Sequence, residues 1–319
     1  MSLLELRSLT ISFRTPSSPV RVVNRISFAV KDAEVFGLVG ESGCGKSLTA
    51  LGIIGLLPEN AFAEGEITFK GSDLLTMDRE YLRGLRGKDV AMIFQEPMTS
   101  LNPVLTIGYQ IAETVITHEN RSRRDAWTRA IDLLRSVKIP SPEIRVKEYP
   151  HQMSGGMRQR AMIAMAIACN PALLIADEPT TALDVTIQSQ ILDLLRRLRQ
   201  ERAMSLLLIT HDLGIISENA DRVAVMYAGR IMELADVGGL FSDPRNPYTL
   251  GLLESLPRGR GIPLTPIPGF VPRPNKLPPG CKFSDRCRFV RDYCREKEPE
   301  LEAITPGHLS RCFRAKEFK

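Results

Sequence analysis

The sequence predicts an α/β fold followed by a small proline-rich extension that contains four cysteines. Short apolar runs alternate with helical patterns through residues 1–254, as in layered α/β domains. A glycine-rich segment follows directly after one apolar run and precedes a helical pattern. Prolines then become dense after residue 257, where a helix or central strand could not continue. We therefore expect a main domain at 1–254, and a linker with a cysteine extension at 255–319.

Composition excludes several classes of protein. The 319 residues are 43% hydrophobic and 25% charged, and the net charge of +5 does not by itself indicate a nucleic-acid partner. The longest apolar run, Ala161–Cys169, is nine residues, against roughly 20 for a membrane helix. The first residues lack the basic flank and apolar stretch of a secretory signal. We expect an intracellular protein whose cysteines are not primarily disulfides.

Four apolar runs have the composition of buried parallel strands: 35–39, 90–94, 173–176 and 206–209. An apolar stripe over residues 187–198 predicts a helix between the last two runs, which makes a strand–helix–strand crossover. The more polar stretch 106–136 is interpreted as an inserted helical piece. Residues 222–227 and 230–234 flank Ala228-Gly229, which indicates a hairpin. Residues 257–279 are expected to be an extended connector.

The glycine-rich segment fits a phosphate-binding loop. It consists of Gly40, Glu41, Ser42, Gly43, Cys44, Gly45, Lys46 and Ser47, and Leu48 opens the helical pattern. Glycines let successive N–H groups face an anion, and the helix N-terminus adds positive potential. Lys46 is expected to reach the β- and γ-phosphates of a nucleotide, and the Ser47 hydroxyl to ligate Mg²⁺.

Acidic residues complete such a site at the end of a second strand. Asp177 and Glu178 follow the apolar run 173–176. We expect Asp177 to hold Mg²⁺ and Glu178 to act as the general base on the attacking water. His211 follows the run 206–209, and we expect it to contact the γ-phosphate because parallel strands end at one sheet edge.

One further motif carries a family resemblance. Met153-Ser154-Gly155-Gly156-Met157 resembles the Leu-Ser-Gly-Gly-Gln signature of the nucleotide-binding subunits of ABC transporters, with methionine at the first and fifth positions. The resemblance covers nearly all of residues 1–250. It implies an ABC-type P-loop ATPase domain: a RecA-like core with antiparallel β and inserted α-helical subdomains, the latter at about 100–165.

The resemblance also implies roles for individual residues and for partners. Gln95 would sense Mg²⁺ and water, Asp184 would lie in the loop that crosses a dimer interface, and Phe13 would stack on adenine, although Phe13 could equally be a strand-core residue. Two such domains would face head to tail, so that Ser154, Gly155 and Gly156 serve the partner's ATP. The implied partners are two permease subunits, a second ATPase and an extracytoplasmic solute-binding protein, with no nucleic acid, at the cytoplasmic face of the inner membrane.

The tail contains Cys281, Cys287, Cys294 and Cys312, separated by five, six and seventeen residues. Four thiols in a short segment with too few apolar residues for a core suggest a metal staple, which the residues leave open between zinc and iron–sulfur. The tail resembles that of peptide-importer ATPases of the dipeptide and oligopeptide type, which implies a [4Fe–4S] cluster; zinc and free thiols remain alternatives.

Peptide import likewise depends on resemblance, through residues 95–103 and the cysteine tail. Nickel or another small solute is an alternative cargo. An ABC-type ATPase acting on nucleic acid or ribosomes is disfavoured, because the interval 47–154 has neither sustained heptads nor cysteine. A non-hydrolysing regulatory module is disfavoured because the lysine, both carboxylates and the histidine are all present.

Overall fold

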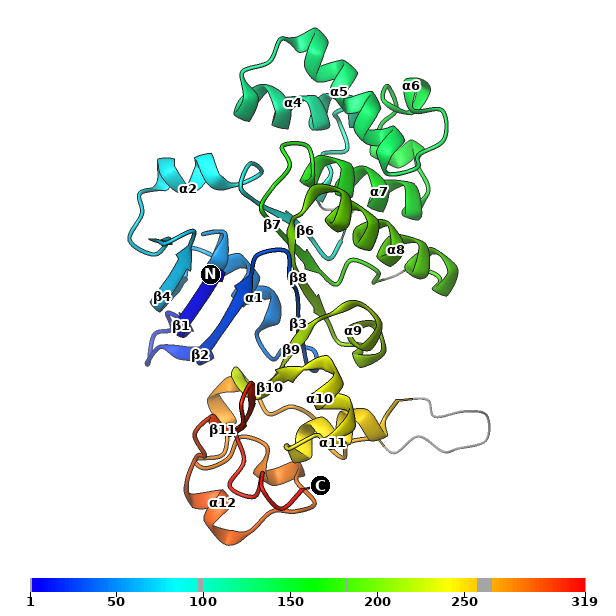
Figure 1. The fold of residues 1–319 in the computed structure, drawn as a ribbon. Coiled ribbons are helices and arrows are strands. Elements are labelled where there is room, and N and C mark those ends of the chain that lie inside the picture. The colour runs from blue at the N-terminus through cyan, green and yellow to red at the C-terminus, as the bar shows by residue number, and fades with distance from the viewer. Residues whose placement is uncertain (1, 97–99, 182, 257–265, 319) are drawn as a thin grey trace. The chain divides into compact units, whose positions relative to one another are not determined.

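The computed structural model describes residues 2–96, 100–181, 183–256 and 266–318. It divides into two compact units: Met1–Thr76 together with Leu208–Lys319, and Met77–Leu207. The segment 95–103 and the connector 257–279 therefore lie partly outside the described residues. Figure 1 shows the elements, which are taken below unit by unit.

The first unit begins with an antiparallel sheet of order β2-β1-β4-β5. Its strands are β1 (Ser2–Phe13), β2 (Val20–Lys31), β4 (Ala61–Phe69) and β5 (Ser72–Asp73). Alternate residues of β1 such as Leu4 and Leu6 are buried, as expected for a sheet with one face on a core. Helix α1 (Lys46–Ile53) approaches this core closely, since a Cβ on Gly52 would lie 3.1 Å from Ile11.

A second sheet of the same unit contains β11-β12-β10-β9-β3 in that order. The strands are β3 (Val35–Val39), β9 (Arg222–Tyr227), β10 (Arg230–Asp236), β11 (Glu302–Thr305) and β12 (His308–Ser310). β3 and β9 are parallel, with Phe36 opposite Arg222. β9 and β10 form the predicted hairpin, and its turn residues Ala228 and Gly229 have φ of 44° and 79°, as a type I′ turn requires.

The remaining elements of this unit are mostly short. They are α9 (Leu213–Asn219), α10 (Val237–Ser242), α11 (Pro247–Glu254), α12 (Asp292–Glu296) and the 3₁₀ turns η2 (Pro274–Lys276) and η3 (Ser284–Arg286). The expected extended connector at 257–279 contains the short turn η2 in its described part, because proline is compatible with the first position of a helical turn. Strand β8 (Ser205–Thr210) spans the boundary between the two units.

The second unit contains two parallel strands, β6 (Val90–Ile93) and β7 (Leu173–Asp177), with Val90 opposite Leu173. Its helices are α2 (Arg79–Leu85), α4 (Ile107–Glu119), α5 (Arg123–Ser136), α6 (Pro142–Arg145), the 3₁₀ turn η1 (Pro150–Gln152), α7 (Gly155–Ala166) and α8 (Val185–Arg202). The predicted helical insert at 106–136 is confirmed as α4 and α5, which begin after the N-caps Thr106 and Ser122. The predicted helix at 187–198 is the central part of α8.

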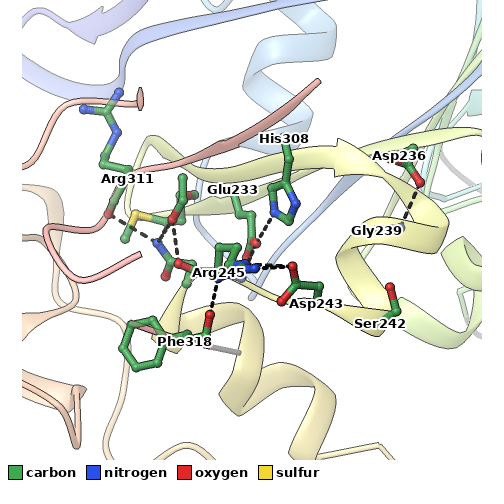
Figure 2. A network of polar contacts seen from close by, with 12 residues as sticks. Glu233, Asp236, Gly239, Ser242, Asp243, Arg245, His308, Arg311 and Phe318 are labelled. Carbon is green, nitrogen blue, oxygen red and sulfur yellow. Dashed lines mark hydrogen bonds and ion pairs between the residues drawn. The ribbon is translucent and has the colours of Figure 1, made fainter. Parts of the chain in front are cut away.

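The cysteine extension joins the second sheet of its unit through β12, which pairs with β10. Figure 2 shows the network of polar contacts around this junction. Glu233 on β10 accepts a hydrogen bond from the Arg245 backbone N–H (2.5 Å) and pairs with His308 Nε2 (2.7 Å). Asn246 donates to the carbonyl oxygens of Met232 (3.0 Å) and Arg311 (3.2 Å). The cysteine extension is therefore stabilised by strand pairing and hydrogen bonds with the sheet to which it adds a strand, and a metal is not needed for these contacts.

No helix in the described part of the chain is both long and apolar enough to cross a membrane.

Candidate functional site

The glycine-rich loop connects β3 to α1, as the sequence predicts. Gly43 and Gly45 have φ of 78° and 108°, which an L side chain rarely adopts. At Gly40 a Cβ would lie 2.0 Å from the Met226 carbonyl oxygen, so only glycine lets the loop pass this close to β9. Helix α1 begins at Lys46, and its N-terminus therefore faces the loop.

Lys46 lies inside this loop. Its side chain is 5% exposed, and Nζ donates to the carbonyl oxygens of Gly40 (2.7 Å) and Glu41 (3.1 Å). Ser47 follows in the first turn of α1 and is half-buried. Cys44 is fully buried, and burial raises the pKa of its thiol, so Cys44 serves packing. A concave backbone with a buried ammonium fits a polyphosphate, and the hydroxyl beside it fits Mg²⁺.

Two residues that sequence reasoning missed hold the loop at Glu41. The Glu41 backbone N–H donates to the hydroxyl of Tyr248 on α11 (3.0 Å). The Glu41 carboxylate receives two hydrogen bonds from the Arg286 guanidinium in the cysteine extension (2.7 and 3.0 Å). Both partners lie more than 200 positions along the chain, so no local pattern could have indicated them.

The acidic residues of the second unit follow β7. Asp177 ends the strand and is 3% exposed. Glu178 has a φ of 47°, an uncommon backbone region for a residue with a side chain. Its Oε2 accepts hydrogen bonds from Thr181 Oγ1 (2.8 Å) and from Gln95 Nε2 (3.3 Å). The structure thus brings the predicted base and the predicted glutamine together, and Thr181 adds a contact that the sequence did not suggest.

The serine–glycine–glycine motif begins α7. Ser154 is the N-cap, and its hydroxyl accepts from the Met157 N–H at 3.3 Å. Gly155 and Gly156 form the first turn, and a Cβ on Gly156 would lie 3.1 Å from Ile187. Met153 is 4% exposed, so the departure at this position keeps an apolar side chain in the core.

The other predicted residues lie at element ends. Asp184 is the exposed N-cap of α8 and accepts from the Ile187 N–H at 2.9 Å. His211 is exposed and directly follows β8. Phe13 ends β1 opposite Val20 and is half-buried, which leaves part of its ring accessible. Phe13, the loop and His211 belong to the first unit, whereas Gln95, the two carboxylates, the signature and Asp184 belong to the second.

The four tail cysteines line one largely apolar cavity of about 20 Å³, together with Phe283 and Ser284. Burial raises the pKa of Cys281 to about 11 and that of Cys312 to about 12, so these two thiols are protonated at neutral pH. The Ser284 hydroxyl is buried there without a hydrogen-bond partner. Within the described ranges, no three His, Cys, Asp or Glu side chains are already arranged to hold a metal ion. The donor set nevertheless fits a thiolate-ligated centre, and the orphaned hydroxyl could donate to an anionic sulfur.

Comparison with known proteins yields two family matches. A family profile described as "ABC transporter" matches residues 23–181, and one described as "Oligopeptide/dipeptide transporter, C-terminal region" matches residues 232–294. The chain is 52% identical to a probable peptide ABC transporter ATP-binding protein of Sinorhizobium fredii, over 99% of this chain and 96% of that protein. It is 49% identical to the dipeptide transport ATP-binding protein DppD of Escherichia coli, over 98% and 96%.

Among solved structures, the fold is similar to the ATP-binding cassette MJ0796 in a dimeric post-hydrolysis state bound to ADP and Pi. The TM-score is 0.66 at 24% identity, covering 73% of this chain and 98% of that one. A similar match is cbiO1 of Clostridium perfringens, with a TM-score of 0.63 over 76% of this chain and 91% of that one. These likenesses show the fold.

Proposed function

Because the chain belongs to the family of ABC transporter ATP-binding subunits of peptide and dipeptide importers, we propose that it binds and hydrolyses ATP to energise the import of di- or oligopeptides. The observation that carries the proposal is the loop with buried Lys46 in a chain that matches such subunits along almost its whole length. The match includes the C-terminal region described for oligopeptide and dipeptide transporters.

For nucleotide binding, backbone N–H groups of residues 40–48 and the Lys46 ammonium hold the β- and γ-phosphates. Phe13 stacks on the adenine with the accessible part of its ring. Ser47, Gln95 and Asp177 would hold Mg²⁺, which neutralises phosphate charge when bound. In this role the Lys46 ammonium gives up its hydrogen bonds to the Gly40 and Glu41 carbonyl oxygens and donates to phosphate oxygens instead.

For hydrolysis, Glu178 accepts a proton from water as the water oxygen attacks the γ-phosphorus, and ADP leaves with the electrons of the cleaved P–O bond. Gln95 and Thr181 orient the carboxylate, since each donates to Oε2. His211 donates to the γ-phosphate as it becomes inorganic phosphate.

The subunit acts in an assembly. Ser154, Gly155 and Gly156 offer the N-terminus of α7 to the γ-phosphate of the ATP held by a second ATPase subunit. The family resemblance favours a distinct chain over a second copy for this subunit. Asp184 lies in the loop that crosses between them. The pair couples to two permease subunits at the cytoplasmic face of the inner membrane, and a solute-binding protein supplies the cargo.

We also propose that Cys281, Cys287, Cys294 and Cys312 hold a [4Fe–4S] cluster. All four thiols line one cavity, and four thiolates are the usual ligands of this cluster. Protein purified without oxygen is expected to be brown, with visible absorbance that is lost in Cys287→Ser and Cys294→Ser and kept in Cys169→Ser. Colourless protein with one zinc per chain would show that the four cysteines bind zinc instead of a cluster. Colourless protein without metal would show that the thiols are free.

The ATPase proposal is tested by Lys46→Ala and Glu178→Gln in the assembled complex. Lys46→Ala is expected to lose ATP binding, because the ammonium is removed from the loop. Glu178→Gln is expected to bind ATP with normal affinity and to lower kcat by at least a hundredfold, because the amide cannot accept the proton. Glu201→Gln, on the exposed end of α8, is the matched control and keeps full turnover. Wild-type turnover in either site variant contradicts the assignment.

The cargo is tested with the complex in proteoliposomes. Addition of the solute-binding protein loaded with dipeptide is expected to stimulate ATP hydrolysis several-fold, whereas the nickel-loaded or empty protein leaves it at the basal rate. Stimulation by nickel without stimulation by peptide would assign the system to the alternative cargo.

A further inference from the structure

Arg286 in the cysteine extension is fixed against the phosphate loop of the same unit. It lies at the end of η3, and its side chain is 5% exposed. The guanidinium makes a two-pronged contact with the Glu41 carboxylate, at 2.7 and 3.0 Å. Its Nε donates to the Pro268 carbonyl oxygen at 2.8 Å, so a third hydrogen bond orients the group. Arg286 also lies over the ring of Tyr227, at 5.7 Å from the centroid.

This environment keeps Arg286 charged. Burial by itself lowers the pKa of the guanidinium, but the hydrogen bonds and charges of Glu41 and Tyr227 together outweigh burial and raise the pKa above its ordinary value. Planar two-pronged pairing of this kind is specific to arginine, because the lysine ammonium is a point charge.

Glu41 is held through three separate groups. Its carboxylate pairs with Arg286, its N–H donates to Tyr248, and its carbonyl oxygen accepts from Lys46 Nζ. The backbone position of the first half of the loop therefore depends on α11 and on the extension as well as on β3. The carboxylate of Glu41 would, if unpaired, place a negative charge within a loop that receives a polyanion.

We propose that Arg286 is a positioning residue for nucleotide binding: it neutralises Glu41 and fixes the phosphate loop, so that the cysteine extension forms part of the ATP site. The inference rests on the proposed ATP binding at this loop. It makes the nucleotide affinity of the subunit depend on an arginine that lies between two of the four cysteines, 245 positions from its partner.

The experiment measures the Kd for ATP of the full chain by titration calorimetry, together with KM and kcat in the assembled complex. Arg286→Gln is expected to raise Kd and KM about tenfold, equal to about 1.4 kcal/mol, with kcat unchanged within twofold. The increase in Kd is expected to be smaller at 0.5 M salt, because salt screens part of the repulsion between the unpaired Glu41 carboxylate and the phosphates. Arg286→Lys keeps the charge without the two-pronged contact and is expected to raise Kd about threefold.

The double variant separates charge from packing. Glu41→Gln together with Arg286→Gln is expected to bind ATP within threefold of wild type, because the unpaired carboxylate has been removed. Arg288→Gln is the matched control: Arg288 makes a similar two-pronged pair with Glu254, at 2.5 and 2.7 Å, and is not expected to change Kd.

Two results overturn the proposal. One is an unchanged Kd in Arg286→Gln; the other is a double variant as weak as Arg286→Gln alone, which would mean that only packing is lost. Lys46→Ala separates this failure from that of the proposed function. If Lys46→Ala loses ATP binding while Arg286→Gln keeps it, only the inference fails; if Lys46→Ala binds ATP as wild type does, the proposed function itself fails.

Discussion

Replacement of Phe283 by alanine tests whether the cysteine extension shares the core of the unit to which it belongs. Phe283 is 4% exposed. Its ring centroid lies 5.3 Å from that of Tyr227 on β9 and 5.2 Å from that of Tyr248 on α11. One extension residue therefore packs against two aromatic side chains from the ATPase domain, next to the cavity lined by the cysteines.

The magnitude follows from this packing. Truncation of a buried phenylalanine costs about 3–5 kcal/mol, because apolar contacts are lost and a cavity remains. The two aromatic pairs keep Phe283 away from the lower end of this range, since each adds about 0.5–1.5 kcal/mol beyond burial. We expect a loss of about 4 kcal/mol. For a unit of 150–250 residues this lowers Tm by about 8–16 °C.

Differential scanning calorimetry of the full chain measures the effect. Phe270→Ala is the matched control, because Phe270 belongs to the same extension and is 93% exposed. Its replacement is expected to change Tm by less than about 2 °C. Equal shifts for the two variants, or a shift below about 3 °C for Phe283→Ala, would refute the conclusion that the extension and the domain share a core.

Three further predictions concern single contacts. Tyr248→Phe leaves the part-buried N–H of Glu41 without its acceptor and is expected to cost about 1–3 kcal/mol in a calorimetric scan; no change in Tm would mean that water replaces the hydroxyl. Asp184→Ala removes the N-cap of α8 and is expected to cost about 1 kcal/mol, whereas Asp184→Asn, which can still cap, is expected to cost little. Burial raises the pKa of Cys169 to about 11, so its alkylation, followed by peptide mass spectrometry, is expected to accelerate about tenfold per pH unit from pH 8 to 10 and to level off above 11. Because this pKa is raised on folding, the stability contributed by the protonated thiol is present below about pH 9 and lost as the pH rises through 11; rapid, pH-independent labelling would contradict both statements.

The features that the sequence determined are those encoded by neighbouring residues. Three features were predicted correctly: the strand Val35–Val39, the loop that follows it and the hairpin at Ala228-Gly229. A buried strand needs an apolar run, and glycine adopts a positive φ most readily in a loop or tight turn, so neighbouring residues are enough to indicate each feature. The order of the elements and the family follow from such local patterns together.

The tertiary structure decided the contacts between residues that are distant along the chain. The hydrogen bond from Gln95 to Glu178 joins two strand ends; both residues were expected from the sequence, but the contact between them was not. Met153 departs from the family signature, yet it is buried, so an apolar side chain of similar size satisfies the position.

The cysteine extension shows this difference most clearly. Taken alone, its composition indicates too few apolar residues for a core and hence the need for a metal staple. In the folded chain Phe283 packs between two tyrosines, β12 adds to β10, and Arg286 reaches the phosphate loop. A segment's own sequence reports only the apolar surface and charge that it contributes, whereas its stability depends on the surface and charge that distant residues present to it, which only the folded chain brings together.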